Sequence, residues 1–199
     1  MNKKLILLLL FISFFSFAQR AKFSEYFNSY KDKSYSLFID YKKDKYTVWV
    51  GLPSNDLISD FTYVQFTNKD NVEFLNAFKL AQNKFNEWKK VNDKEKLNSV
   101  VKDMDIESKK FHYSFVLGDN LYNTNSDKLK FKFIVENDIP YCVFYAKGLA
   151  SSTNSYIRMN GFELRFSNDE DFSNFFEKLK KESILSFIEK DEHKKKLLQ

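Results

Sequence analysis

The chain has 199 residues, of which 43% are hydrophobic and 30% are charged, a composition that provides for a packed core and an ordinary charged surface. Its formal net charge is +5, and basic and acidic residues are interleaved rather than gathered, which argues against nucleic acid as a partner. The single cysteine, Cys142, excludes an intrachain disulfide, and its apolar neighbours predict a small buried side chain.

Residues 1–18 have the pattern of a signal peptide. Two lysines precede an apolar run that ends at Phe15, and the small residues Ser16 and Ala18 precede a cleavage site. The run is too short to span a bilayer comfortably, so we expect no stable membrane span after cleavage; an N-terminal anchor is the alternative. Loss of the two lysines gives a net charge of 5 − 2 = +3. The remainder, 19–199, is then a single domain of periplasmic or secreted location.

The first elements after this segment are rich in aromatic residues. In residues 21–30 these recur at helical spacing, which predicts a short N-terminal helix. Two aromatic and β-branched runs, 34–41 and 45–51, flank a short polar stretch and predict a hairpin. A loop over 51–56 and a third strand near 61–66 follow.

The middle of the chain carries the longest helical signal. From Val72 to Trp88, apolar residues recur every three or four positions, with lysine, asparagine and glutamate on the other face. A shorter stripe of the same kind, from Leu97 to Met104, predicts a second helix.

The second half is mostly strand. A strand over 111–118 precedes a loop, and the runs 129–136 and 139–146 form a predicted hairpin. Asn160-Gly161 predicts a two-residue type I′ turn, because both positions favour positive φ. The last predicted helix covers 169–188.

The halves 31–106 and 111–190 share one order of elements: hairpin, loop, strand, helix. The aligned pairs are Val64 with Leu164, Phe66 with Phe166, Phe38 with Phe133 and Tyr46 with Tyr141. The match leaves an internal repeat and coincidence both open. Either way the pattern predicts an α+β fold: an antiparallel sheet of about six to eight strands with helices packed mainly on one face.

Two capping boxes are expected at the starts of the helices that end these halves. Thr67 with Asp70, and Ser167 with Glu170, have the spacing at which a hydroxyl and a carboxylate satisfy each other's free backbone amides. The acidic residues there are therefore predicted to be caps rather than catalysts.

Motifs that carry chemistry are absent from the sequence. The four glycines form no phosphate-binding loop, and the two histidines, His112 and His193, are far apart. One cysteine cannot begin a thiolate metal site. We therefore predict no catalytic residue, no metal and no cofactor.

One cluster of residues is a candidate ligand site. The predicted Asn160-Gly161 turn would place Tyr156, Arg158, Glu163 and Arg165 on one face of a hairpin. Guanidinium groups bind carboxylate or phosphate in a bidentate way, so the cluster predicts an anion-binding patch. The structural alternative is a cross-strand ion pair beside a cation–π contact.

The leading hypothesis is an exported, non-catalytic binding or interaction protein. Its partner would be a small apolar ligand or an envelope protein, bound at the sheet face that helices do not cover, with residues 146–155 at the rim. One alternative is an exported, hydrolase-like enzyme with a site near His112. Another is an inhibitor or immunity-type protein that acts on a partner enzyme.

Overall fold

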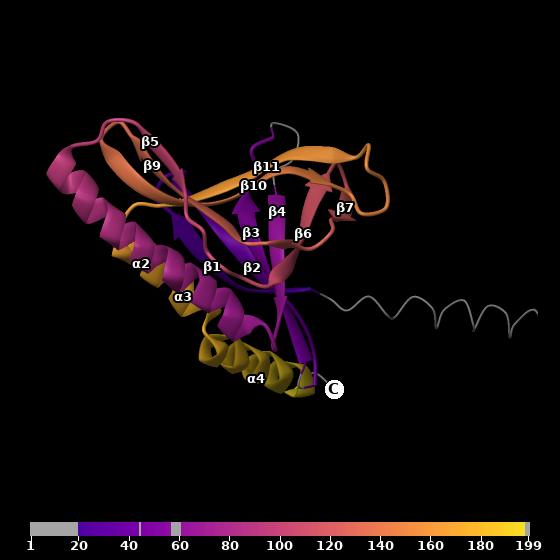
Figure 1. The fold of residues 1–199 in the computed structure, drawn as a ribbon. Helices are drawn as coiled ribbons and strands as arrows, with labels where there is room; N and C mark the ends of the chain where they lie inside the picture. The colour runs from indigo at the N-terminus through magenta and orange to yellow at the C-terminus, as the bar shows by residue number, and fades with distance from the viewer. Residues whose placement is uncertain (1–19, 44, 57–60, 198–199) are drawn as a thin grey trace, which may run out of the picture.

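The structure is a computed structural model that describes residues 20–43, 45–56 and 61–197. The predicted signal peptide, 1–18, lies outside these residues. The described chain forms eleven strands and three helices, shown in Figure 1. The strands are β1 (Ala21–Asn28), β2 (Lys33–Lys42), β3 (Lys45–Pro53), β4 (Phe61–Thr67), β5 (Val100–Asp103), β6 (Lys110–Leu117), β7 (Asn120–Asn123), β8 (Asp127–Lys128), β9 (Lys130–Glu136), β10 (Ile139–Ala150) and β11 (Arg158–Phe166). The helices are α2 (Asn71–Glu95), α3 (Asp169–Leu179) and α4 (Lys181–Leu197).

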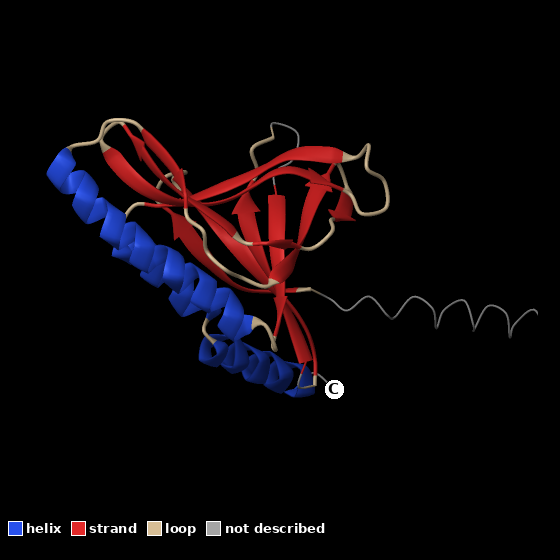
Figure 2. Cartoon of the chain, viewed as in Figure 1, coloured by secondary structure: helices blue, strands red, loops and turns tan. Residues whose placement is uncertain are grey.

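The strands form two antiparallel sheets. A seven-stranded sheet has the order β1-β2-β3-β4-β6-β7, with β8 paired to β6, and a four-stranded sheet has the order β11-β10-β9-β5. Isolated bridges join the two sheets, Ser54 with Phe162 and Thr124 with Ser151. The helices lie on one side of the sheets, as Figure 2 shows, which confirms the predicted α+β class. Among the described residues, no helix has the length and apolar character needed to cross a bilayer.

Helix α2 joins both sheets through one stripe of phenylalanines. Phe78, which is fully buried, has ring contacts with Phe131 of β9 at 4.9 Å and with Phe144 of β10 at 5.0 Å between centroids. Its neighbour Phe74 stacks on Phe66 of β4 at 4.6 Å. The predicted stripe is thus the centre of the core, because one helix face buries apolar surface from both sheets.

The predicted N-terminal helix is wrong, because residues 21–28 form strand β1. In a strand, Phe23 and Tyr26 should point to opposite faces, since their spacing is odd. A register shift between Lys22 and Ser24 resets the alternation, and both rings reach the helices: Phe23 contacts Phe187, and Tyr26 contacts Phe175. The bulge therefore imitates helical spacing.

Two further helix predictions are also corrected. The stripe from Leu97 to Met104 forms the short edge strand β5, whose Val100 pairs with Val135 of β9. The last helix is not continuous, because Lys180 is extended, with φ −59° and ψ 141°, and separates α3 from α4. In both places tertiary pairing and packing override a weak local pattern.

The predicted hairpin at Asn160-Gly161 is wrong. Gly161 has the expected positive φ, 98°, but it lies inside β11 and pairs with Lys147 of β10. A Cβ at this position would overlap the carbonyl oxygen of Ala146. The glycine is therefore needed for the close approach of the paired strands β10 and β11. The connection between these strands is the segment 151–157.

The two halves share an element order: β2-β3-β4-α2 and β9-β10-β11-α3 are both meanders followed by a helix. The predicted pairing of Phe38 with Phe133 is out of register, because Phe38 is half-buried on the outward face whereas Phe133 is in the core. A shift of one residue places Ile39 with Phe133, both inward. An internal duplication stays a prediction.

The capping arrangements differ in detail from those expected. At α2, Thr67 donates its hydroxyl to the Asp70 carboxylate at 2.5 Å, and no side chain caps the helix. At α3 the cap is Asn168, whose side chain accepts from the amide of Asp171 at 3.0 Å, while the Asp171 carboxylate accepts from the amide of Ser167 at 2.8 Å. The second box is therefore shifted by one residue from Ser167 and Glu170.

The close approach of β10 to Gly161 predicts that a larger residue at this position lowers the stability of the protein strongly. Gly161→Ala should lower the free energy of unfolding by at least about 3 kcal/mol, because the new methyl group must displace the backbone of β10. Gly118→Ala is the matched control: its φ is +59° and a Cβ there would meet nothing within 4 Å, so only about 1 kcal/mol should be lost. Urea unfolding measures the free energy of unfolding of both variants. Equal decreases in the two would contradict the close approach of β10 to Gly161.

Candidate functional site

The four residues of the predicted anion patch do not form one cluster: Glu163 and Arg165 meet, whereas Tyr156 and Arg158 lie apart from them. Tyr156 is 93% exposed in the loop between β10 and β11, and Arg158 at the start of β11 donates its Nε to the carbonyl of Ser155 at 2.5 Å. Glu163 and Arg165 lie further along β11, on the outward face of the four-stranded sheet. The predicted partners Arg158 and Glu163 are separated because the hairpin that would pair them is absent.

Glu163 and Arg165 belong to a network of four charged side chains across that face. The Arg165 guanidinium contacts Glu136 through Nη1 and Glu163 through Nη2, the latter at 3.2 Å. Lys132 of β9 donates to Glu163 at 2.5 Å. Two cations thus alternate with two carboxylates over three neighbouring strands.

Aromatic rings cover the cations of this network. The Arg165 guanidinium lies 4.2 Å from the centroid of Tyr30, and Lys132 lies 4.7 Å from that of Tyr145. Burial raises the pKa of the Glu163 carboxyl, but hydrogen bonds and charges from Lys132 and Arg165 outweigh burial and lower it. An incoming anion would have to displace a carboxylate from Arg165. The contacts are of the kinds named in the structural alternative, an ion pair and a cation–π contact, but Arg165 makes them with Glu136, Glu163 and Tyr30.

The outward face of the seven-stranded sheet has a different character. Three aromatic rings surround that of Tyr63: Phe38 at 6.1 Å, Trp49 at 6.2 Å and Phe61 at 6.5 Å between centroids. These four lie outside the main hydrophobic core. The contacts among these four rings join strands β2, β3 and β4, and Figure 2 places the helices on the other side of the sheet.

Strand register explains how this aromatic cluster (Phe38, Trp49, Phe61, Tyr63) forms. Phe38 lies on β2 and Tyr63 on β4, and their rings meet across β3. The β3 partner of Phe38 is Trp49, and that of Tyr63 is Gly51, where a Cβ would come within 2.7 Å of the Ser36 carbonyl oxygen. A glycine here both allows the close approach of β2 and leaves the space above β3 open to the rings.

Arg20 and Asp40 fix the tryptophan of the cluster. The Arg20 guanidinium carbon lies 3.5 Å from the centroid of the Trp49 ring. Asp40 accepts the indole N–H of Trp49 at 2.7 Å and lies 3.6 Å from Arg20 Nε. This arrangement keeps the ring 8% exposed on a face without helix cover.

His112 lies on the same face, exposed on β6 and paired across the strands with Gln65 of β4. Gln65 donates to the Ser114 hydroxyl at 2.5 Å, and Ser114 donates to the side-chain oxygen of Asn123 at 2.7 Å. The Ser114 hydroxyl is therefore held by the side-chain amides of Gln65 and Asn123. The arrangement provides hydrogen-bonding groups but no activated nucleophile.

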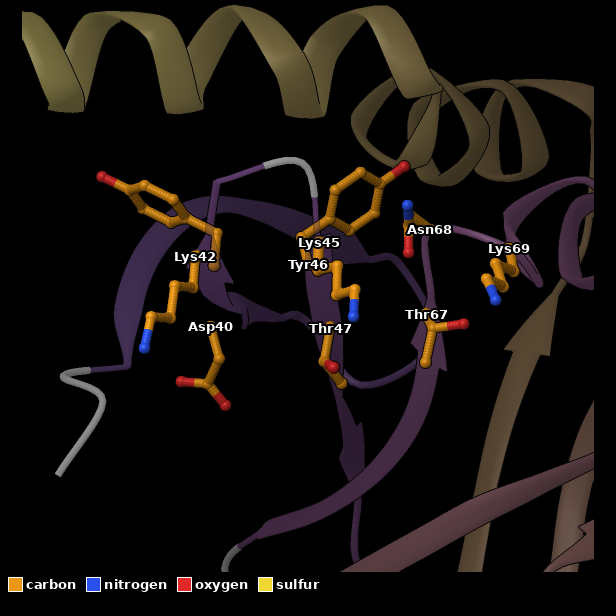
Figure 3. A pocket seen from close by; sticks show the side chains of 9 residues that line it. Asp40, Lys42, Lys45, Tyr46, Thr47, Thr67, Asn68 and Lys69 are labelled. Carbon is orange, nitrogen blue, oxygen red and sulfur yellow. The ribbon is translucent and has the colours of Figure 1, made fainter. Parts of the chain in front are cut away.

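A cavity of about 420 Å³ lies at the end of this face, beyond the aromatic cluster. We call it the lysine pocket; its lining residues are Asp40, Tyr41, Lys42, Lys45, Tyr46, Thr47, Thr67, Asn68 and Lys69 (Figure 3). It is formed where β2 turns into β3 and where β4 leads into α2. Helix α4 supports the hairpin, because Tyr41 donates to Asp191 at 2.5 Å.

The described part of the chain contains no group of three or more histidine, cysteine, aspartate or glutamate side chains that could hold a metal ion. Cys142 is buried as predicted, and burial raises the pKa of its thiol. A thiol held in its protonated form in the core is a packing residue rather than a nucleophile.

No protein-family model matches the chain, and comparisons with curated proteins and with solved structures gave no match. Function must therefore be argued from the two outward faces. Sequence patterns did not indicate the aromatic cluster, although aromatic residues on alternate positions of three successive strands were visible in Phe38, Trp49 and Tyr63.

The charged network predicts a pH-dependent contribution to stability. Because the pKa of Glu163 is lowered in the folded state, its contribution is present above the ordinary value of 4.5 and is lost as the pH falls through the folded value. Glu163→Gln should therefore lower the free energy of unfolding by about 1–3 kcal/mol at pH 7, with the loss shrinking on acidification.

The matched control is Glu177→Gln, which removes an exposed ion pair with Lys180 and should cost less than about 0.5 kcal/mol. Denaturant unfolding at several pH values measures both variants. A Glu163→Gln loss that is unchanged between pH 7 and pH 3 would contradict a charge-dependent role.

Proposed function

We propose that the protein is an exported, non-catalytic binding protein whose contact surface is the outward face of the seven-stranded sheet. One observation carries the proposal: the aromatic cluster lies outside the main core, and the ring contacts of Phe38, Trp49 and Tyr63 within the described part of the chain are with rings on strands. Contiguous apolar groups on a face of this kind are typical of interaction sites. Aromatic residues and arginine, present here as Trp49, Tyr63 and Arg20, also dominate the energetics of interfaces.

The polar groups around the cluster support binding rather than turnover. Gln65, Ser114 and Asn123 form a chain of hydrogen bonds beside the rings, which suits recognition of a ligand with hydroxyl or amide groups. The hydrolase-like alternative depends on His112, which has no nucleophile aligned with it among the described residues. Activity screening followed by His112→Ala separates that alternative from the proposal.

Substitutions on the aromatic cluster should weaken binding of the physiological ligand. Phe38→Ser and Tyr63→Ser should each raise Kd more than about fivefold, because each removes a ring from the centre of the contact surface. The readout is the fluorescence of Trp49 in a Trp88→Phe background, since the chain has two tryptophans. The probes are fatty acids, neutral and acidic polysaccharides, and a hydrophobic dye.

The control for these variants is Tyr156→Ser, which removes an exposed aromatic ring from the β10–β11 loop and should leave Kd unchanged. Circular dichroism checks that all variants are folded. Binding that is as sensitive to Tyr156→Ser as to Tyr63→Ser would contradict the assigned face. The absence of any probe-induced change in Trp49 emission would contradict the binding function.

Export predicts a processed N-terminus. When the full chain is produced in a Gram-negative bacterium, the intact mass of the recovered protein should correspond to a start at Gln19. Ala18→Glu should block this processing, because the residue before the cleavage site must be small, whereas Phe17→Leu should not. Recovery of the wild-type chain with its first 18 residues still attached would contradict export by cleavage.

A further inference from the structure

We propose that the lysine pocket binds the acidic group of a sugar ring in an anionic polysaccharide whose neighbouring rings lie on the aromatic cluster. This inference rests on the proposed binding function and gives the ligand a chemical class. It follows from the charge of the pocket, its hydrogen-bonding groups and its position beside the aromatic cluster.

Three lysines give the pocket a positive charge. Lys42, Lys45 and Lys69 line it, and among the described residues none of the three has an ion-pair partner. Asp40 is the acidic residue of the lining. Its Oδ2 accepts from Trp49 at 2.7 Å and lies 3.6 Å from Arg20, while its buried Oδ1 has no hydrogen-bond partner among the described residues. Three free ammonium groups around one cavity attract an anion.

The pocket also offers hydroxyl groups at the same depth. Thr47 and Thr67 lie side by side on β3 and β4, next to Asp40 on β2. The Thr67 hydroxyl donates to Asp70 at 2.5 Å, so its oxygen remains an acceptor for a ligand hydroxyl. The ligand that suits these groups carries several hydroxyls as well as a negative charge.

Position links the pocket to the aromatic cluster. Cross-strand pairing makes Asp40–Thr47–Thr67 one row of the outward face and Phe38–Trp49–Gln65 the row two residues along each strand. A polymer with one acidic group in the pocket would therefore lay its next rings over Phe38 and Tyr63, because the Arg20 guanidinium already lies on the Trp49 ring (Figure 3 shows the pocket end). Rings with an apolar face and hydroxyl edges match a surface of alternating aromatic and amide groups.

Two other polyanions fit less well. An acidic peptide would gain most from an exposed strand edge, where backbone groups can pair, but the pocket lies on a sheet face. An anionic membrane surface is flat and would favour protruding charged and aliphatic side chains rather than a cavity of about 420 Å³ beside packed rings. Both are included as competing outcomes of the test.

The experiment measures Trp49 emission of the Trp88→Phe protein against four probes. Polygalacturonate represents an acidic polysaccharide and dextran a neutral one; polyglutamate represents an acidic peptide, and vesicles of phosphatidylcholine with phosphatidylglycerol represent a membrane. We expect saturable binding of polygalacturonate that weakens as salt is raised, and at least about tenfold weaker binding of the other three probes.

The decisive variant replaces Lys42, Lys45 and Lys69 together by glutamine. It should weaken polygalacturonate binding about tenfold, because three exposed charge contacts are lost. The matched control replaces three exposed lysines of α2 and α3, Lys79, Lys90 and Lys178, by glutamine and so changes the net charge equally. This control should change Kd less than about twofold.

Several results would overturn the inference. Equal weakening by both triple variants would indicate attraction by net charge alone, and tighter binding of polyglutamate or of vesicles would assign the pocket to another polyanion. Dextran binding that equals polygalacturonate binding and is lost in Tyr63→Ser would retain the binding face but remove the acidic specificity. If no polysaccharide binds but another ligand still depends on Phe38 and Tyr63, the inference fails and the proposed function stands.

Discussion

The packing of Phe78 is the interaction on which the rest of the architecture depends. This one ring contacts β9 and β10 of the small sheet, Phe166 of β11 and Phe175 of α3, and the same helix face reaches β4 of the large sheet through Phe74. A fully buried phenylalanine that is lost to alanine typically costs about 3–5 kcal/mol. Because α2 joins both inner faces, it directs the opposite faces of the two sheets outward, and those faces then differ in how they satisfy their own side chains.

The outward faces illustrate two ways of treating exposed strand surface. On the four-stranded sheet, charge pairs run in a linear series from Lys132 through Glu163 and Arg165 to Glu136, and rings of Tyr30 and Tyr145 cover the cations. Such a network is locally neutral and specifies strand register. On the seven-stranded sheet the rings of Phe38, Trp49 and Phe61 contact that of Tyr63, and Arg20 lies on Trp49. The arginine-based prediction of an anion patch therefore fell partly on the four-stranded sheet, where Arg165 is already paired with Glu136 and Glu163.

Much of the architecture was accessible from sequence, and the errors have physical causes. The stripe of α2, the β2–β3 and β9–β10 hairpins and the helices on one side follow from strong local periodicity. Where a bulge resets alternation, as between Lys22 and Ser24, strand residues imitate a helix. Gly161 has the positive φ that a turn needs, but it lies within β11, where the backbone of Ala146 on β10 leaves no room for a Cβ. That contact cannot be read from the residues around Gly161. The candidate site was less accessible, because Phe38, Trp49 and Tyr63 come together only through the register of three strands.

The remaining asymmetry between the faces is electrostatic. Charges in a series of ion pairs cancel within a few ångströms, so they project little field into solvent, whereas free ammonium groups around a cavity add their fields. Lys42 and Lys45 are adjacent across the β2–β3 hairpin, an arrangement that repels in the unliganded protein and is disfavoured for directly opposed strand residues. The Tyr41–Asp191 hydrogen bond to α4 holds that hairpin in place despite the repulsion. An anion between the two ammonium groups would offset this repulsion, by a small amount because both side chains are exposed to screening solvent.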